Sequence, residues 1–491
     1  MKVIMVLFDT LRKKELSPYG NDWIETPNFD RLEKQSLTFD NHYAGSLPCM
    51  PARREMHTGR YNFLHRSWGP LEPFDDSLPE ILKENDIYTH LVTDHSHYLE
   101  DGGATYHNRF STAEIFRGQE GDRWKDHLRE IEIPEQLETV KSNTSFKQNW
   151  VNRLYQKKEE DYSSYKTFEA GLEFLENNKD KDDWLLQIES FDPHEPFRSP
   201  EKYQDLYPDD YSGKFFDWPS YQEVTENKEA IEHIKYRYAA SISMCDNLLG
   251  KVLDMMDKNN MWEDTMLIVS TDHGFLLGEH NWWGKNIQPC YNEIANIPFF
   301  IWNPDFKEKN SHRNSLSQII DIAPTILDYF NLETPENMEG KSLNPIIKSD
   351  EKIRDTALFG VHGGHINLTD GKYVYMRSSK SAENQPLYQY TLMPTHMRGF
   401  FRKENLEKAA LTKEFSFTNN IPVLKIPTDT LIASYKFGSK LFDLDKDPAQ
   451  ENNLIEKSQD LELKMISKLK EAMIEAEAPA EQFERLGLDK N

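Results

Sequence analysis

The sequence predicts an α/β fold with a large mixed or parallel sheet flanked by helices, followed by a smaller α+β domain with an antiparallel sheet. Three observations carry this prediction. The chain has 491 residues, of which 37% are hydrophobic, enough for one large and one smaller core. Short apolar runs alternate with segments of helical period along most of its length. After about residue 350 the pattern changes to short alternating strands.

Five short apolar runs predict the strands of the large sheet, because a strand covered on both faces is apolar along its whole length. In chain order they are VIMVLF (3–8), YTHLVT (88–93), WLLQIES (184–190), MLIVS (266–270) and IPFFIW (297–302). Segments of helical period lie between them, at 28–36, 77–85, 165–178 and 234–259. This alternation is typical of a sheet with helices on both faces.

The C-terminal part begins after an expected link at 347–355. KYVYMR and SKLFDLD predict short strands at 372–377 and 439–445, and a helix rich in Lys and Glu follows at 456–476. We therefore expect one domain over 1–350 and a second over 351–491. The second contains a basic, aromatic-rich insert, which includes YQYTLMPTHMRGFFRK at 388–403.

Charge and composition narrow the class of partner. The formal net charge of −25 repels polyanions, so we expect no nucleic-acid partner. No run approaches the ~20 apolar residues of a membrane span, and we expect no membrane partner. The first residues, MKVIMVLFDT, hold too short an apolar stretch for a secretory signal, and three cysteines are too few for a disulfide framework or a zinc site. The expected location is the cytoplasm.

Acids and imidazoles follow four of the predicted strands. They are Asp9, then Asp94, His95 and His97, then Asp192 and His194, then Asp272 and His273. Each alone could be a turn or helix-cap residue, but ligands of open α/β sheets bind beyond the carboxyl ends of the strands. Asp9, Asp272 and His273 can supply two carboxylates and an imidazole to one divalent cation. Carboxylates favour Ca²⁺, Mg²⁺ or Mn²⁺, and the imidazole leaves Mn²⁺ or Zn²⁺ open.

A short helix is predicted within GSLPCMPARREMHTGRY (45–61), since Pro51 suits a first helical turn and Gly59 a helix end. Cys49 then lies just before the helix N-terminus, where free N–H groups favour an anion. We expect a nucleophilic thiol with a lowered pKa, and Arg53 pointing back at it. A small buried cysteine is the alternative, and it is the expectation for Cys245; Cys290 is undecided.

CMPARREMHTGR (49–60) resembles the signature of the formylglycine-dependent sulfatases, Cys-x-Pro-x-Arg followed by Thr-Gly. Further family-like segments follow in the family's order. They are VLFDTLR (6–12), TPNFDRLEKQSLTFDNHYA (26–44), STDHGFLLGEHNWWGK (270–285), IDIAPTILDYF (320–330), MEGKSLNP (338–345) and LFDLDKDPAQENNL (441–454). The resemblance covers nearly the whole chain except about 110–180 and 378–438.

This resemblance implies a type I sulfatase of the alkaline-phosphatase superfamily, with a catalytic domain over 1–350 and a small C-terminal sheet domain. It implies that a maturation enzyme oxidises Cys49 to formylglycine, whose hydrate attacks sulfur while Arg53 holds it. Asp9, Cys49, Asp272 and His273 would bind one divalent cation, Ca²⁺ first, with Mn²⁺ or Mg²⁺ as alternatives.

By the same resemblance, Lys285 and His194 match positions that bind the sulfate oxygens and assist the leaving alcohol, and His280 lies nearby. Three departures from the family pattern stand out. Thr10 follows Asp9 where the family usually has a second acid, and His273 stands where many members have Asn. TDHSHY (93–98) replaces Gly-Lys-x-His, so His95 and His97 are candidates to replace the lysine.

The leading interpretation is a cytoplasmic sulfatase acting on a small sulfated mono- or disaccharide, with homo-oligomerisation left open. A phosphonate monoester or phosphodiester hydrolase with the same nucleophile is the alternative, and Thr10 and His273 favour it slightly. A non-catalytic binder of sulfated ligands is the third interpretation. The presence of Cys49, Arg53 and Asp272 argues against that binder.

Overall fold

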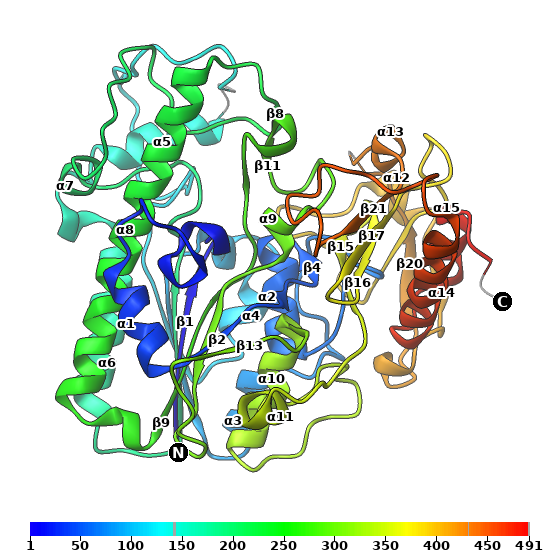
Figure 1. The fold of residues 1–491 in the computed structure, drawn as a ribbon, viewed down its shortest axis with the longest axis horizontal. Coiled ribbons are helices and arrows are strands. Elements are labelled where there is room, and N and C mark those ends of the chain that lie inside the picture. Colours follow the sequence, from blue (N-terminus) through cyan, green and yellow to red (C-terminus); the bar gives the residue numbers. More distant parts are fainter. Residues whose placement is uncertain (141–143, 431, 490–491) are drawn as a thin grey trace.

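A computed structural model describes residues 1–140, 144–430 and 432–489. Figure 1 shows a large sheet between two layers of helices, with a smaller unit of strands and helices beside it. Helices α1 (Pro27–Gln35), α6 (Ser163–Asn178) and α8 (Lys228–Lys258) cover one face of the sheet. Helices α2 (Cys49–Thr58), α3 (Leu78–Glu84), α10 (Ile322–Tyr329) and α11 (Asn344–Ser349) cover the other. The predicted α/β class is confirmed.

The large sheet has eight strands in the order β13-β2-β12-β9-β1-β7-β5-β6. Its centre consists of β1 (Lys2–Phe8), β5 (Tyr88–Thr93), β7 (Trp184–Ser190) and β9 (Thr265–Thr271), all parallel. Strand β12 (Phe299–Trp302) runs antiparallel to β9, so the sheet is mixed. These are the five predicted strands. The edge strands are β13 (Ser311–Arg313) and β6 (Thr112–Ile115), and β2 (Leu37–Phe39) lies between β13 and β12.

Two hydrophobic cores lie on opposite faces of this sheet. Successive side chains of β1 alternate between them, because the side chains of a strand point to opposite faces. Val3, Met5 and Leu7 pack in the core under α2 and α10. Ile4 and Val6 pack in the core under α1, α6 and α8. This double burial explains why the central strands are apolar throughout.

A second sheet has the order β21-β17-β16-β15-β4. Strands β15 (Ala357–Val361), β16 (Ile366–Thr369), β17 (Tyr373–Arg377) and β21 (Lys440–Asp443) are antiparallel, and α14 (Gln459–Glu475) packs on them. Strand β4 (Ser46–Leu47), just before α2, joins β15 in parallel. The predicted link at 347–355 starts within α11. The division at residue 350 stays a prediction.

The insert forms a third sheet of β18 (Tyr388–Thr391), β20 (Val423–Pro427) and β19 (Ala410–Thr412), which was not predicted. The other short strands are β3 (His42–Tyr43), β8 (Gln222–Glu223), β10 (Leu276–Leu277), β11 (Trp282–Gly284) and β14 (Ser317–Gln318). The other α-helices are α4 (Ala104–His107), α5 (Thr144–Arg153), α7 (Glu201–Gln204), α9 (Asn292–Ala295), α12 (Lys403–Leu406), α13 (Ser434–Phe437) and α15 (Ala480–Leu486). Among the helices built by the described residues, none has the length and apolar character to cross a bilayer.

Candidate functional site

The carboxyl ends of the four central strands meet at one edge of the sheet, as the sequence predicts. Because β9, β1, β7 and β5 are neighbours and parallel, the residues that follow them lie close together. Asp9 after β1 and Asp272 after β9 are fully buried in one cluster. Asp94 and Asp192 form a separate pair, joined by the Gln119 amide, whose Nε2 donates to both at 2.7 and 2.8 Å.

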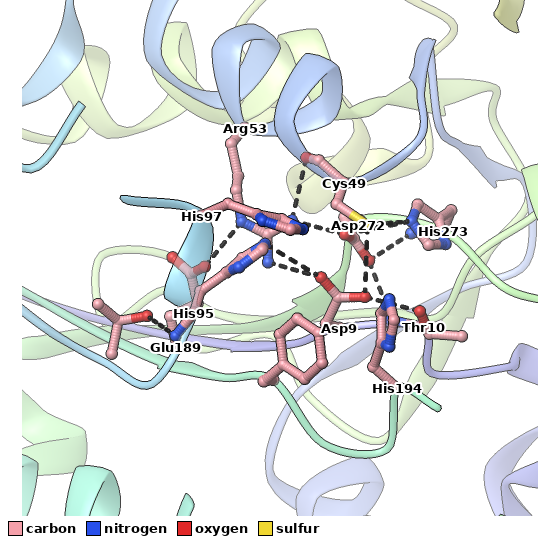
Figure 2. A network of polar contacts seen from close by, with 12 residues as sticks. Asp9, Thr10, Cys49, Arg53, His95, His97, Glu189, His194, Asp272 and His273 are labelled. Carbon is pink, nitrogen blue, oxygen red and sulfur yellow. Dashed lines mark hydrogen bonds and ion pairs between the residues drawn. The ribbon is translucent and has the colours of Figure 1, made fainter. Parts of the chain in front are cut away.

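Helix α2 brings Cys49 and Arg53 to this cluster (Figure 2). Gly59 ends the helix with φ 59°, in the left-handed conformation that favours glycine, as predicted. Cys49 is the first residue of the helix rather than the residue before it. Its Sγ lies 3.2 Å from Nε2 of His273 and 3.8 Å from Oδ1 of Asp9.

The Arg53 guanidinium binds three buried carboxylates at once. Its Nε donates to Glu189 at 2.7 Å, Nη1 to Asp272 at 2.6 Å and Nη2 to Asp9 at 2.9 Å. A further bond from Nη1 reaches the Cys49 carbonyl at 3.0 Å. Sequence reasoning missed Glu189, although it is the only acid within the five apolar runs. Arg53 therefore holds the acidic cluster in place.

Thr10 makes the turn that carries Asp9. Its φ of 64° is strained for a β-branched residue, and such strain often marks a functional site. The Thr10 hydroxyl donates to Oδ1 of Asp9 at 2.6 Å and accepts from Nζ of Lys285 at 3.0 Å. Thr10 thus connects the acidic cluster to the lysine.

Four side chains form a set that fits a metal ion. The ligand atoms of Asp9, Cys49, Asp272 and His273 all lie within 4.8 Å of one another. Nδ1 of His273 donates to the Gly274 carbonyl at 3.0 Å, so the lone pair of the neutral ring is at Nε2, which faces the cluster. Burial lowers the pKa of His273 to about 3, so the ring stays neutral.

The charges of the cluster also favour a cation. One guanidinium faces three buried carboxylates, and buried charges are tolerated mainly when they are paired or bound to a metal. Burial raises the pKa of Asp9 well above its usual value, and the neighbouring Asp272 raises it further. The donor set therefore fits a divalent cation.

The expectation of a lowered thiol pKa is wrong. Burial raises the pKa of Cys49 well above its usual value, and the Asp9 carboxylate adds to this effect. These contributions outweigh the positive charges of Lys285 and Arg53. In the metal-free cluster the unmodified thiol therefore stays protonated, and a protonated thiol is a poor nucleophile.

A cavity of about 640 Å³ opens beside Cys49. It is lined by the predicted site residues His97, His194 and Lys285, and by Trp68, Glu120, Glu195, Trp218, Tyr221 and Arg398 among others. Arg398 comes from the basic, aromatic-rich insert. The individual residues Arg398, Glu120 and Glu195 were not singled out, because only the fold brings their distant segments together.

His95 and His97 take different places. His97 lies at the cavity wall, with Nδ1 3.0 Å from Glu100. His95 lies behind the cluster, fully buried, with Nε2 3.5 Å from Oδ2 of Asp9. Both rings lie beside Arg53 in Figure 2. Of the two, His97 has the position to contact a substrate.

His194 and Lys285 also line the cavity. Nδ1 of His194 carries the proton of the neutral ring and donates it to the Glu195 carbonyl at 2.5 Å. Nε2 therefore has a free lone pair. Burial and the charge of Lys285 lower the pKa of His194 well below its usual value. Burial acts to lower the pKa of Lys285, but the neighbouring carboxylates, Glu195 and Asp9 among them, raise it and keep the ammonium charged.

The remaining candidates lie outside this cavity. His280 stacks on Tyr291 with 3.5 Å between ring centroids, and its Nε2 is 3.5 Å from Glu293. Cys245 and Cys290 are buried in the two hydrophobic cores. None of the three cysteines, all within the described residues, forms a disulfide.

Comparison with known families agrees with this geometry. The family model described as Sulfatase matches residues 2–332, well over half of the chain. The chain belongs to the sulfatase family. It is therefore a sulfuric ester hydrolase of the alkaline-phosphatase superfamily. A second model, described as N-sulphoglucosamine sulphohydrolase, C-terminal, matches residues 278–416 and extends into the insert.

Individual relatives of this sulfatase are distant. An arylsulfatase from Clostridium perfringens is 24% identical over 398 residues, which cover 74% of this chain and 81% of the relative. An N-acetylglucosamine-6-O-sulfatase from Bacteroides thetaiotaomicron is 23% identical over 410 residues, 71% of each chain. The solved phosphonate monoester hydrolase of Agrobacterium radiobacter shares the fold, with a TM-score of 0.68 and 17% identity over 97% of this chain and 96% of that one.

Proposed function

We propose that this sulfatase hydrolyses the sulfate ester of a small sulfated mono- or disaccharide, with formylglycine derived from Cys49 as the nucleophile. The observation that carries the proposal is the position of Cys49. Its Sγ belongs to a buried four-ligand cluster and also lines a cavity with Lys285 and His194. A group at position 49 can therefore contact a cation and a substrate together.

Cys49 is better suited to be modified than to act as a thiolate, because its thiol stays protonated in this acidic surrounding. Oxidation of Cys49 to the aldehyde by a maturation enzyme replaces this poorly nucleophilic thiol. The hydrate of that aldehyde supplies a hydroxyl as the attacking group. This proposal requires that the host provides the maturation enzyme.

Asp9, Asp272, His273 and the modified residue 49 would hold the divalent cation. Two carboxylates favour a hard cation, so we assign Ca²⁺, with Mn²⁺ or Mg²⁺ as the alternatives to test. When bound, the cation supplies charge neutralisation for the nucleophile and the sulfate. Arg53 holds the two carboxylates in position through its hydrogen bonds to Asp9 and Asp272.

Three side chains at the cavity complete the site. The charged ammonium of Lys285 lines the cavity, where it would bind the sulfate oxygens. His97 lines the same cavity and would take the role of the lysine that the family usually has in this segment. His194 has Nε2 available, because Nδ1 is engaged by the Glu195 carbonyl. A bound anion favours the protonated ring of His194, which can then give a proton to the leaving alcohol.

A sugar substrate is supported by the cavity itself. Its volume of about 640 Å³ lies within the range of small-molecule sites, roughly 300–1,000 Å³. Trp68, Trp218 and Tyr221 provide aromatic surface along its wall. The related N-acetylglucosamine-6-O-sulfatase points to the same substrate class.

The alternative is a phosphonate monoester hydrolase with the same nucleophile. Thr10 after Asp9 and the imidazole of His273 favour it, and the fold is shared with a solved enzyme of that activity. Both chemistries use a tetrahedral anion in the same cavity. Substrate turnover must decide between them.

The deciding experiment uses protein produced together with a formylglycine-generating enzyme and loaded with Ca²⁺. Sulfate release from a panel of sulfated mono- and disaccharides is compared with turnover of 4-nitrophenyl phenylphosphonate and bis(4-nitrophenyl) phosphate. The proposal expects the highest kcat/KM on a sulfated sugar. A higher kcat/KM on the phosphonate or the diester would replace it with the alternative. The Cys49→Ala variant reports any background from the host.

A further inference from the structure

Glu195, which follows His194 in FDPHEPF (191–197), has one carboxylate oxygen without a hydrogen-bond donor. The residue lines the cavity and is only 2% exposed. Its Oε1 accepts from the Tyr221 hydroxyl, whereas Oε2 accepts no hydrogen bond from any described residue. Buried carboxylate oxygens are almost always hydrogen-bonded in native proteins, so this exception needs an explanation.

Lys285 does not provide that bond. Its Nζ lies 3.6 Å from Oε2 of Glu195, beyond hydrogen-bonding distance, and donates instead to Thr10 at 3.0 Å. Nδ1 of His194 lies 3.4 Å from the same oxygen but donates to the Glu195 carbonyl. Oε2 therefore stays available beside the two residues expected to bind the sulfate.

A second carboxylate lines the same cavity. Glu120 lines the cavity, and its Oε2 lies 3.9 Å from Nη2 of Arg398. Burial raises the pKa of Glu195, although the charge of Lys285 acts to lower it. Acceptors of this kind beside Trp68 and Tyr221 suit a molecule with an apolar face and several hydroxyl groups.

We infer that Glu195 determines specificity: its Oε2 accepts a hydrogen bond from a hydroxyl or amino group next to the sulfate ester of the substrate, and Glu120 accepts a second one. This inference rests on the proposed function, because the sulfate must lie at Lys285. A substrate without such a donor leaves Oε2 of Glu195 buried without a hydrogen bond. That penalty is the physical basis of the selection.

The test compares a sulfated sugar that the enzyme hydrolyses with its deoxy analogue, which lacks the hydroxyl next to the ester. Wild-type enzyme and Glu195→Gln are measured, both with equal formylglycine content. In the variant, the Tyr221 hydroxyl holds the amide oxygen at the Oε1 position and turns the NH₂ group toward the substrate. Glu333→Gln is the control, since Glu333 is exposed and does not line the cavity.

We expect the wild type to prefer the hydroxyl-bearing sugar at least tenfold in kcat/KM, a preference that Glu333→Gln keeps and Glu195→Gln reduces at least tenfold. Equal losses on both substrates, with the preference intact, would overturn the inference and make Glu195 a positioning residue for Lys285. If the wild-type enzyme does not prefer the hydroxyl-bearing sugar over its deoxy analogue, that result alone would overturn the inference. Failure of the proposed function is a separate result: no sulfated sugar is hydrolysed while the phosphonate is.

Discussion

The thiol of Cys49 lies 3.2 Å from Nε2 of His273, where the first turn of α2 faces the residues that follow β9. The ring presents a lone pair there, because its other nitrogen donates to the Gly274 carbonyl. Residue 49 can thus serve both as a metal ligand and as the reacting group. The predictions below start from this arrangement.

The first prediction concerns the chemical state of residue 49. In protein made with a formylglycine-generating enzyme, the tryptic peptide QSLTFDNHYAGSLPCMPAR (35–53) should have the mass of an aldehyde in place of the thiol. Sulfatase activity should rise in proportion to that fraction, and Cys49→Ser from the same host should lose at least about 1,000-fold, as for a removed nucleophile. Full activity in protein with an unmodified cysteine would contradict the mechanism.

Removal of the metal should abolish most of the enzymatic activity and lower the thermal stability of the protein. Chelation should reduce kcat at least about 100-fold, because metal stabilisation of developing charge is worth several kcal/mol. Added Ca²⁺ should raise the unfolding midpoint, since it binds only the folded cluster. Asp272→Asn should abolish that rise, whereas Asp254→Asn, at a 73% exposed side chain, should keep it. Bound metal is counted by elemental analysis.

Loss of Arg53 should destabilise the metal-free protein strongly. Arg53→Met leaves the buried carboxylates of Asp9, Glu189 and Asp272 unpaired, and the free energy of unfolding should fall by about 3–5 kcal/mol. Arg31→Met is the matched control, because Arg31 also binds two aspartates but at the surface. Its cost should stay below about 1 kcal/mol in chemical denaturation. Equal losses in the free energy of unfolding for the two variants would contradict the idea that the buried carboxylates depend on Arg53 for charge compensation.

The Asp94–Asp192 pair should make the protein less stable as the pH rises. Burial raises the pKa of Asp94 to about 7 and that of Asp192 to about 6. The folded state therefore binds more protons than the unfolded state above pH 4. Stability falls from there up to about pH 7, by at most about 1.4 kcal/mol per pH unit for each group. Asp94→Asn should show a shallower fall in denaturation measured from pH 5 to 8; an unchanged slope would contradict this assignment.

Much of the large sheet could be predicted because its central strands are buried on both faces. Such strands appear as continuous apolar runs, and the acids and imidazoles that follow them had to meet at one edge. Strand β4 could not be found, since Ser46 and Leu47 are too few to show a period. The sheet of the insert was missed because its short strands are paired across loops of the chain.

The electrostatics of the site were the hardest part to predict. A helix N-terminus and a nearby arginine predict a thiolate at Cys49, but burial and Asp9 raise its pKa instead. Asp9 and Asp272 follow β1 and β9, and Glu189 lies in β7, so only the fold shows that all three bind Arg53. Glu195 and Arg398 likewise meet in one cavity from segments that are far apart in sequence.

The pairing of β4 with β15 sets an order of events during synthesis. Cys49 is 1% exposed, and the segment just before it is held by Gly360, whose N–H donates to the Gly45 carbonyl at 2.9 Å. In the folded protein the thiol is therefore almost completely covered. The proposed oxidation of Cys49 would therefore have to take place before this sheet closes. A molecule that folds first would then keep the cysteine and lack the proposed nucleophile.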